Sequence, residues 1–157
     1  MNVKLIVVAK TDAPYLQEGI ALYERRLRHY TPFEMVVVPA LKDTKNLDPA
    51  EIKRREGQLL LQQMQRCDRV VLLDEHGQRF TSVAFAAHLQ RHMNASLRTL
   101  GFVIGGAYGF ADEVYAAAHE RLSLSDMTFN HQMVRLFFVE QLYRAFTILR
   151  HEPYHNE

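Results

Sequence analysis

The chain has 157 residues, of which 48% are hydrophobic and 24% are charged, and its formal net charge at pH 7 is +1. A chain of this size predicts one domain, residues 1–157, and its near-neutral charge excludes the global basic field that free nucleic-acid binders carry. The single cysteine, Cys67, excludes an internal disulfide and a cysteine-rich metal site, and no apolar run approaches the ~20 residues of a membrane span, so we expect a cytoplasmic protein without membrane contact.

Five short apolar runs alternate with helical patterns along the chain and predict an α/β fold. The runs expected to form strands are residues 3–9, 33–38, 69–73, 100–104 and 120–124. Because these runs lack polar alternation, they indicate a mostly parallel sheet with helices on both faces. The predicted helices between them cover residues 13 to about 28, a segment that begins at the N-cap Asp48, residues 82 to about 93, and residues 111–118.

The last predicted helix, from residue 131 to about 150, is apolar on nearly all of its sides. A surface helix would be apolar along one stripe only. We therefore predict that a second copy of the chain covers the remaining face and forms a homodimer. The alternative is a helix that is central to its own monomer. Glu140 and Arg144 have i, i+4 spacing on this helix and are expected to pair.

A glycine-rich segment, VIGGAYGF at residues 103–110, follows the fourth predicted strand. A dinucleotide-binding fold would carry its glycines after the first strand, but residues 7–15 contain none, so that assignment fails. The pattern GGxxG is weak by itself, since glycines also form simple tight turns. The motifs that accompany it therefore carry most of the information.

Six motifs, spread over the whole chain, resemble those of one known family. They are LYERRL at 22–27, REGQ at 55–58, VIGGAYG at 103–109, LSLSDMTFNHQMVR at 122–135, EQLYRAF at 140–146 and PYH at 153–155, of which the last three together are specific. The chain resembles the small bacterial SPOUT methyltransferases that methylate N3 of a pseudouridine in large-subunit (23S) ribosomal RNA. It departs from that family at Ala9, Asn130 and Asn156, where glycine, proline and a basic residue are usual.

The resemblance implies a C-terminal trefoil knot that holds S-adenosylmethionine against the backbone of three loops, with no metal in the reaction. Glycine suits such a loop because the missing Cβ lets the backbone approach a ligand closely. Asp126 is expected either to face the sulfonium or to remain a solvated carboxylate. By motif match, the residues expected to bind the cofactor are Leu73, Gly105, Gly106, Leu124, Ser125, Asp126, Met127, Thr128 and Phe129.

Methylation of the imide nitrogen N3 requires that its proton be removed, which favours a nearby base or a cation that stabilises the imidate. His131 is a candidate for the base, although a histidine at a helix start also serves as a capping or packing residue. The resemblance further implies that the C-terminal tail enters the active site beside the cofactor loops of the partner subunit. Tyr154 would then contact the target base, and His155 would assist deprotonation.

The resemblance implies that the substrate is ribosomal RNA within the assembled ribosome. This fits a net charge of +1 and the lack of an appended RNA-binding domain, with which recognition of bare RNA is expected to be poor. Contacts with phosphate would come from basic residues of the first two helices: Arg25, Arg26, Arg28, His29, Lys53, Arg54 and Arg55. Two alternatives remain open. One is a non-catalytic knotted module that binds the ribosome, and the other is a nucleotide-dependent oxidoreductase, which the missing first-turn glycines disfavour.

Overall fold

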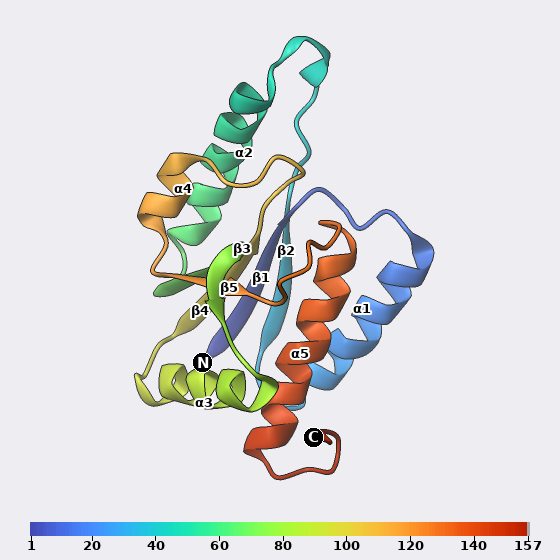
Figure 1. Ribbon diagram of the computed structural model, residues 1–157, viewed down its shortest axis with the longest axis vertical. Coiled ribbons are helices and arrows are strands. Elements are labelled where there is room, and N and C mark those ends of the chain that lie inside the picture. Colours follow the sequence, from blue (N-terminus) through green and yellow to red (C-terminus); the bar gives the residue numbers. More distant parts are fainter. Residues whose placement is uncertain (157) are drawn as a thin grey trace.

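The computed structural model describes residues 1–156, and its strands form one sheet in the order β2-β1-β4-β3-β5 (Figure 1). Every neighbouring pair is parallel, which confirms the predicted α/β class. The strands are β1 (Asn2–Val8), β2 (Phe33–Val38), β3 (Arg69–Arg79), β4 (Thr99–Ile104) and β5 (Glu120–Ser123).

Helices cover both faces of the sheet, as predicted. On one face lie α1 (Pro14–Leu27), α3 (Ser82–Asn94) and α5 (Met133–Leu149), and on the other lie α2 (Pro49–Met64) and α4 (Asp112–Ala117) (Figure 1). A short 3-10 helix, Thr44–Asn46, precedes α2. Within the described part of the chain, no helix is both long enough and apolar enough to cross a membrane.

The side chains of β1 explain why the predicted strands lack polar alternation. Leu5 and Val7 belong to the core beneath α1, α3 and α5, whereas Ile6 and Val8 belong to the core beneath α2 and α4. None of the four is more than 5% exposed. Successive residues of a strand point to opposite faces, so a sheet covered on both faces needs apolar residues at every position.

Strand β3 is longer than predicted, because it continues beyond Leu73 through the polar residues up to Arg79. Its pairing with β5 shifts in register between Leu73 and Gln78. A Cβ at Gly77 would lie 2.6 Å from the backbone of Arg121, so glycine is needed for the two strands to approach here. The extension could not be predicted from the sequence, because residues 74–79 are largely exposed and show no alternation of apolar and polar residues.

The last helix, α5, begins at Met133, two residues later than predicted, because residues 131–132 form a turn. The Asn130 side chain accepts a hydrogen bond from the backbone N–H of Gln132 at 2.7 Å. Asn130 therefore orders the turn that leads into α5. Glu140 and Arg144 pair at 2.6 Å, as their spacing predicts.

Most of the apolar surface of α5 is buried within its own subunit, which corrects the expectation that a partner covers one whole face. Phe138, Val139 and Leu142 are fully buried where α5 packs against the sheet between α1 and α3. The exposed apolar residues of the helix are Met133 and Phe137, which are 38% and 40% exposed. A partner therefore has only this short outer stripe of α5 to cover.

Arg135 is a buried cation that ties α5 to the end of β1. It is 1% exposed, and its guanidinium donates to the backbone oxygens of Val8 and Ala9 at 2.6 and 2.9 Å and to the hydroxyl of Thr11 at 3.1 Å. Carbonyl oxygens in the interior need such donors. Arg135 therefore fixes the start of α5, and with it residue 131, relative to the sheet.

Ala9 adopts a left-handed conformation, with φ of 65°. This conformation is strained for a residue with a Cβ and unstrained for glycine. We expect Ala9→Gly to raise the free energy of unfolding by about 0.5–1 kcal/mol, the relief of strain being partly offset by the flexibility of glycine in the unfolded chain. Urea unfolding measures this, and an unchanged or lower midpoint would contradict it.

Candidate functional site

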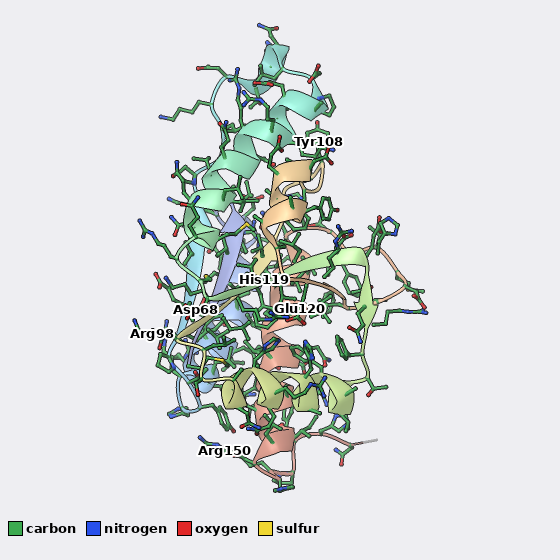
Figure 2. All side chains as sticks on the ribbon, turned by 90° about the vertical axis from the view of Figure 1, so that its left-hand side faces the viewer. Asp68, Arg98, Tyr108, His119, Glu120 and Arg150 are labelled. Carbon is green, nitrogen blue, oxygen red and sulfur yellow. The ribbon has the colours of Figure 1, made fainter. Side chains whose placement is uncertain are left out.

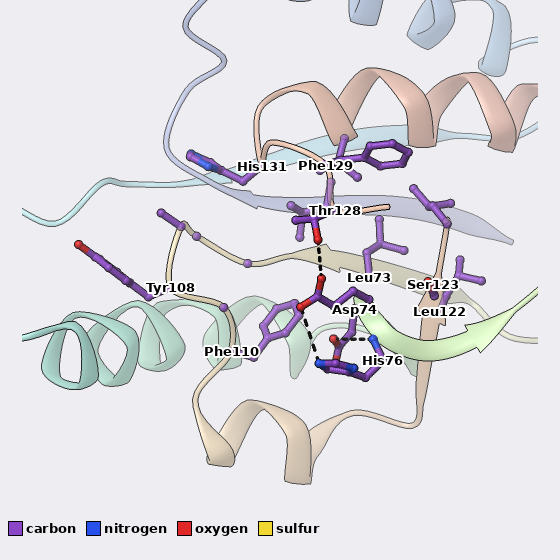
Figure 3. A pocket seen from close by; sticks show the side chains of 18 of the residues that line it. Leu73, Asp74, His76, Tyr108, Phe110, Leu122, Ser123, Thr128, Phe129 and His131 are labelled. Atoms are coloured by element: carbon purple, nitrogen blue, oxygen red, sulfur yellow. Dashed lines mark hydrogen bonds and ion pairs between the residues drawn. The ribbon is translucent and has the colours of Figure 1, made fainter. Parts of the chain in front are cut away.

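A cavity of about 670 Å³ lies at the carboxyl ends of β3, β4 and β5 (Figure 3). Leu73 of β3, the segment 104–110 after β4 and the loop after β5 form its walls. In parallel sheets, ligands bind outside the carboxyl ends of the strands. The cavity is lined by eight of the nine residues expected to bind the cofactor: Leu73, Gly105, Gly106, Leu124, Ser125, Met127, Thr128 and Phe129.

The glycine-rich segment turns tightly along one wall of the cavity. The backbone N–H of Gly109 donates to the carbonyl of Gly106 at 3.1 Å, and Gly109 has φ of 83°, which glycine adopts without strain. Phe110 follows the turn and is buried in the core beneath α2 and α4. This anchor holds the turn in place while leaving the backbone at residues 105–109 facing the cavity.

Glu56 of α2 supports the turn from outside the cavity. A Cβ at Gly106 would lie 2.5 Å from Oε1 of Glu56 and 2.9 Å from Oε2, so a side chain at this position would have to displace the Glu56 carboxylate or the turn. Oε1 is buried and has no hydrogen-bond partner among the described residues. Burial also raises the pKa of the Glu56 carboxyl above its ordinary value. The glutamate of the REGQ motif therefore contacts the loop that the sequence associates with the cofactor.

We expect Gly106→Ala to weaken binding of S-adenosylmethionine at least about 10-fold, because the new methyl group meets Glu56 and displaces the turn. Calorimetric titration measures the affinity. The double variant Glu56→Ala, Gly106→Ala removes the clash and is expected to recover most of the binding, while Glu56→Ala alone is the matched control. Equal weakening in the double variant would show that the methyl group obstructs the donor itself.

The third loop is ordered by hydrogen bonds of its own side chains. Ser123 donates to the carbonyl of Ser125 at 3.0 Å, and the Ser125 hydroxyl accepts from the backbone N–H of Met127 at 2.9 Å. Thr128 donates to Glu75 at 2.9 Å and so joins this loop to the extension of β3. Asp126 does not line the cavity, because it points outward and pairs with Arg79 at 2.5 Å. Its position matches the solvated alternative.

The structure adds lining residues that the sequence did not assign to the cavity. Asp74 follows Leu73 in β3, and its Oδ2 is buried with no hydrogen-bond partner among the described residues. Burial, and then the neighbouring Asp74, raise the pKa of Tyr115 to about 12, so this phenol stays protonated at neutral pH and can donate a hydrogen bond. Lys53 of α2 also reaches the cavity. An acidic residue directly after a buried strand was the available signal for Asp74.

The three predicted catalytic residues lie in two places. His131 lines the cavity, at the turn before α5 (Figure 3). Tyr154 and His155 lie elsewhere, against α1 and the second half of α5 of the same subunit. Tyr154 donates to Glu140, which is about 10 Å along the helix axis beyond Met133. One subunit therefore does not bring the tail to its own cavity.

The tail is held in a defined position although it is the end of the chain. The Tyr154 hydroxyl donates to Glu140 at 2.9 Å and lies 3.3 Å from the hydroxyl of Tyr23, and Arg144 stacks over the Tyr154 ring at 4.8 Å. His155 accepts a hydrogen bond from Arg144 at 3.0 Å through Nδ1. Polar terminal residues are poorly ordered unless they are tied down, so these contacts explain why the end of the chain has a defined position.

Comparisons with known proteins identify the family. A family model described as "Predicted SPOUT methyltransferase" matches residues 1–155. The chain is 54% identical over 156 residues to ribosomal RNA large subunit methyltransferase H of Christiangramia forsetii, with 99% of both chains covered. It is also 54% identical over 157 residues to the protein of the same name from Parabacteroides distasonis, with 100% of both chains covered.

Two solved structures share the fold at low identity. One is a probable methyltransferase from Bordetella pertussis Tohama I, with a TM-score of 0.56, 14% identity, and coverage of 92% of this chain and 95% of that chain. The other is a probable methylase family protein from Haemophilus influenzae Rd KW20, with a TM-score of 0.55, 12% identity, and coverage of 99% and 70%. The chain therefore belongs to the SPOUT methyltransferase family, with the trefoil-knotted α/β fold of that family and S-adenosylmethionine as its methyl donor.

Proposed function

We propose that this chain transfers a methyl group from S-adenosylmethionine to N3 of a pseudouridine in large-subunit (23S) ribosomal RNA, acting on the assembled ribosome. The observation that carries the proposal is the identity of 54% to ribosomal RNA large subunit methyltransferases H across 99% or more of both chains. The target atom follows from the resemblance of the motifs. Residues 1–157 act in this proposal as one domain.

The lining of the cavity suits the donor. Its volume of about 670 Å³ falls within the ~300–1,000 Å³ that is usual for small-molecule sites. The backbone at Gly105 and Gly106 is open to the ligand, and the unpartnered Oδ2 of Asp74 offers a hydrogen-bond acceptor. Asp74 and Glu75 make the lining favourable for a cation. When bound, the donor supplies an electrophilic methyl group carried on a sulfonium.

We propose His131 as the base that removes the proton of N3, because this histidine lines the cavity. As the N3–CH3 bond forms and the S–CH3 bond breaks, the proton of N3 moves to the imidazole and later to water. His155 is a less suitable base, since Arg144 donates to its Nδ1 and the proton of the neutral ring therefore sits on Nε2. Burial and the hydrogen bonds to Tyr23 and Glu140 raise the pKa of Tyr154, so this hydroxyl stays protonated at neutral pH. In this proposal it leaves Glu140 and donates to a carbonyl beside N3 when the target base is bound.

The position of the tail supports a homodimer with composite sites. If Tyr154 contacts the target base, as proposed, it must reach the cavity of a partner, because a subunit's own tail does not line its cavity. Exposed apolar residues adjoin the cavity: Met127 at 78%, Met133 at 38% and Phe137 at 40%. A second copy seated on this stripe would bury these side chains and bring its tail against the cavity.

Of the basic residues of α2, some are paired with a carboxylate and others are available to contact phosphate. Arg54 and Arg55 both pair with Glu51 at 2.8 Å, so part of their charge is already compensated. Lys53 lines the cavity, whose mouth the target nucleotide must enter. We therefore propose Lys53 as a phosphate contact beside the flipped base.

Methyl transfer from labelled donor to ribosomes of a strain that lacks the modification tests the function. We expect label in large-subunit RNA, and digestion to nucleosides should yield pseudouridine methylated at N3. Donor binding and ribosome binding without transfer would instead identify a non-catalytic module. Binding of NADH without binding of S-adenosylmethionine would identify the oxidoreductase.

A further inference from the structure

A second cluster of functional side chains lies on the α3 side of the sheet. His88 and His92 are four residues apart on α3 and therefore share one face of the helix, and Glu120 is the first residue of β5. Figure 2 shows Glu120 where the sheet meets this helix. The side chains of His88, His92 and Glu120 are 19%, 9% and 17% exposed.

The three side chains point their ligand atoms at one position. Nε2 of His92 lies 3.2 Å from Nε2 of His88 and 3.0 Å from Oε2 of Glu120, and Oε1 of Glu120 contacts Nε2 of His88. All of these atoms lie within 4.8 Å of one another. Ligands about 2.0–2.1 Å from a tetrahedral zinc ion are about 3.3 Å apart, so the spacing of the two nitrogens matches such a site.

The rings are held in this orientation by packing. Phe80 stacks on the His88 ring with the centroids 4.9 Å apart, and the two histidine rings meet edge to face at 4.7 Å. Arg69 donates to Oε2 of Glu120 at 2.8 Å. A partner of this kind orients a carboxylate ligand from outside the coordination shell.

We propose that His88, His92 and Glu120 form a three-ligand zinc site that links α3 to β5. Two imidazoles and one carboxylate are a ligand set that Zn²⁺ prefers, and a water completes the tetrahedron. β5 leads directly into the loop of residues 124–129 that lines the cavity. The ion therefore steadies one wall of the donor site without taking part in methyl transfer, and the two proposals fail or hold independently.

Arg91 provides a further test, because its hydrogen bond and zinc binding require different tautomers of His88. In the structure Arg91 donates to Nδ1 of His88 at 2.9 Å, which leaves the proton of the ring on Nε2. Zinc binding at Nε2 moves that proton to Nδ1, so the exposed Arg91 side chain must turn away. Arg91→Ala is therefore expected to tighten zinc binding, the opposite of what removal of a ligand does.

The test is titration of the EDTA-treated, dialysed protein with Zn²⁺ by calorimetry, together with Co²⁺ absorption as a probe of tetrahedral geometry. We expect one Zn²⁺ per chain, a rise in melting temperature on binding, and a loss of affinity of about 100-fold or more in His92→Ala and Glu120→Gln. His29→Ala, which changes an exposed histidine of the α1 end, is the matched control and should bind as the wild type.

Circular dichroism and a cooperative thermal unfolding transition establish that each variant is folded. Glu120→Gln serves as the second ligand variant, because it preserves the shape of the side chain if His92→Ala does not fold. Failure of the wild type to bind one Zn²⁺ would overturn the proposal and leave an ordinary histidine–glutamate–arginine cluster. Unchanged zinc binding in both folded ligand variants would overturn it as well.

Discussion

Deletion of residues 154–157 is expected to abolish methyl transfer to ribosomes, by about 100-fold or more, while the dimer and donor binding remain. The reason is that, in the proposed function, the tail contributes Tyr154 to the reaction, whereas the donor site is formed by residues 73–76 of β3 and the loops after β4 and β5. Glu157 itself lies outside the described residues. Steady-state assays on ribosomes and calorimetric donor titration separate the two effects.

The matched control for this deletion removes only residues 156–157 and should keep most of the activity. Tyr154→Phe removes the hydroxyl but keeps the ring against Tyr143 and Arg144, and it measures the hydrogen bond alone. Full activity in the longer deletion would contradict the assignment of the tail. It would show that the contacts with Glu140 only order the end of the chain.

Mixing two variant subunits tests whether the tail acts at the cavity of its own subunit or at that of its partner. A subunit without residues 154–157 has an intact cavity, and a Gly106→Val subunit has an intact tail but a displaced turn. Random mixing yields about half heterodimers, each with one whole site, so about a quarter of the wild-type activity should return. Absence of rescue in verified heterodimers would mean that the tail acts in its own subunit.

Phe137→Asp is expected to raise the dissociation constant of the dimer by at least about 100-fold and to reduce methyl transfer with it. Phe137 is 40% exposed on the outer stripe of α5, so the carboxylate is solvated in the monomer and loses its water only in the dimer. Phe138→Asp is not a comparable test, because Phe138 is fully buried against Phe102 and would unfold the subunit. Sedimentation equilibrium measures the change.

Val37→Asp is the matched control, since Val37 is 43% exposed on β2, at the opposite edge of the sheet from β5. It should leave the association unchanged. A wild-type protein that sediments as a monomer at micromolar concentration would contradict the dimer itself. The composite site would then need a different explanation for the position of Tyr154.

The sequence by itself determined the class of the fold and the family. Apolar runs without alternation indicated strands buried on both faces, and β1 shows why, since Leu5 and Ile6 face different cores. The N-cap at Asp48 and the pair Glu140–Arg144 were predictable because both depend on residues within one turn of helix. Motifs over the whole chain pointed to the family that the comparisons show.

Only the tertiary structure decided which distant residues meet. Parallel strands are joined by crossover connections, so neighbours at one edge of the sheet come from far apart in the chain. Glu56 against Gly106, and His88 and His92 against Glu120, depend on such connections and leave no local pattern. How much of α5 its own subunit covers was hidden for the same reason. A helix apolar on most sides has the same sequence whether its cover is α1 and α3 of its own chain or a second subunit.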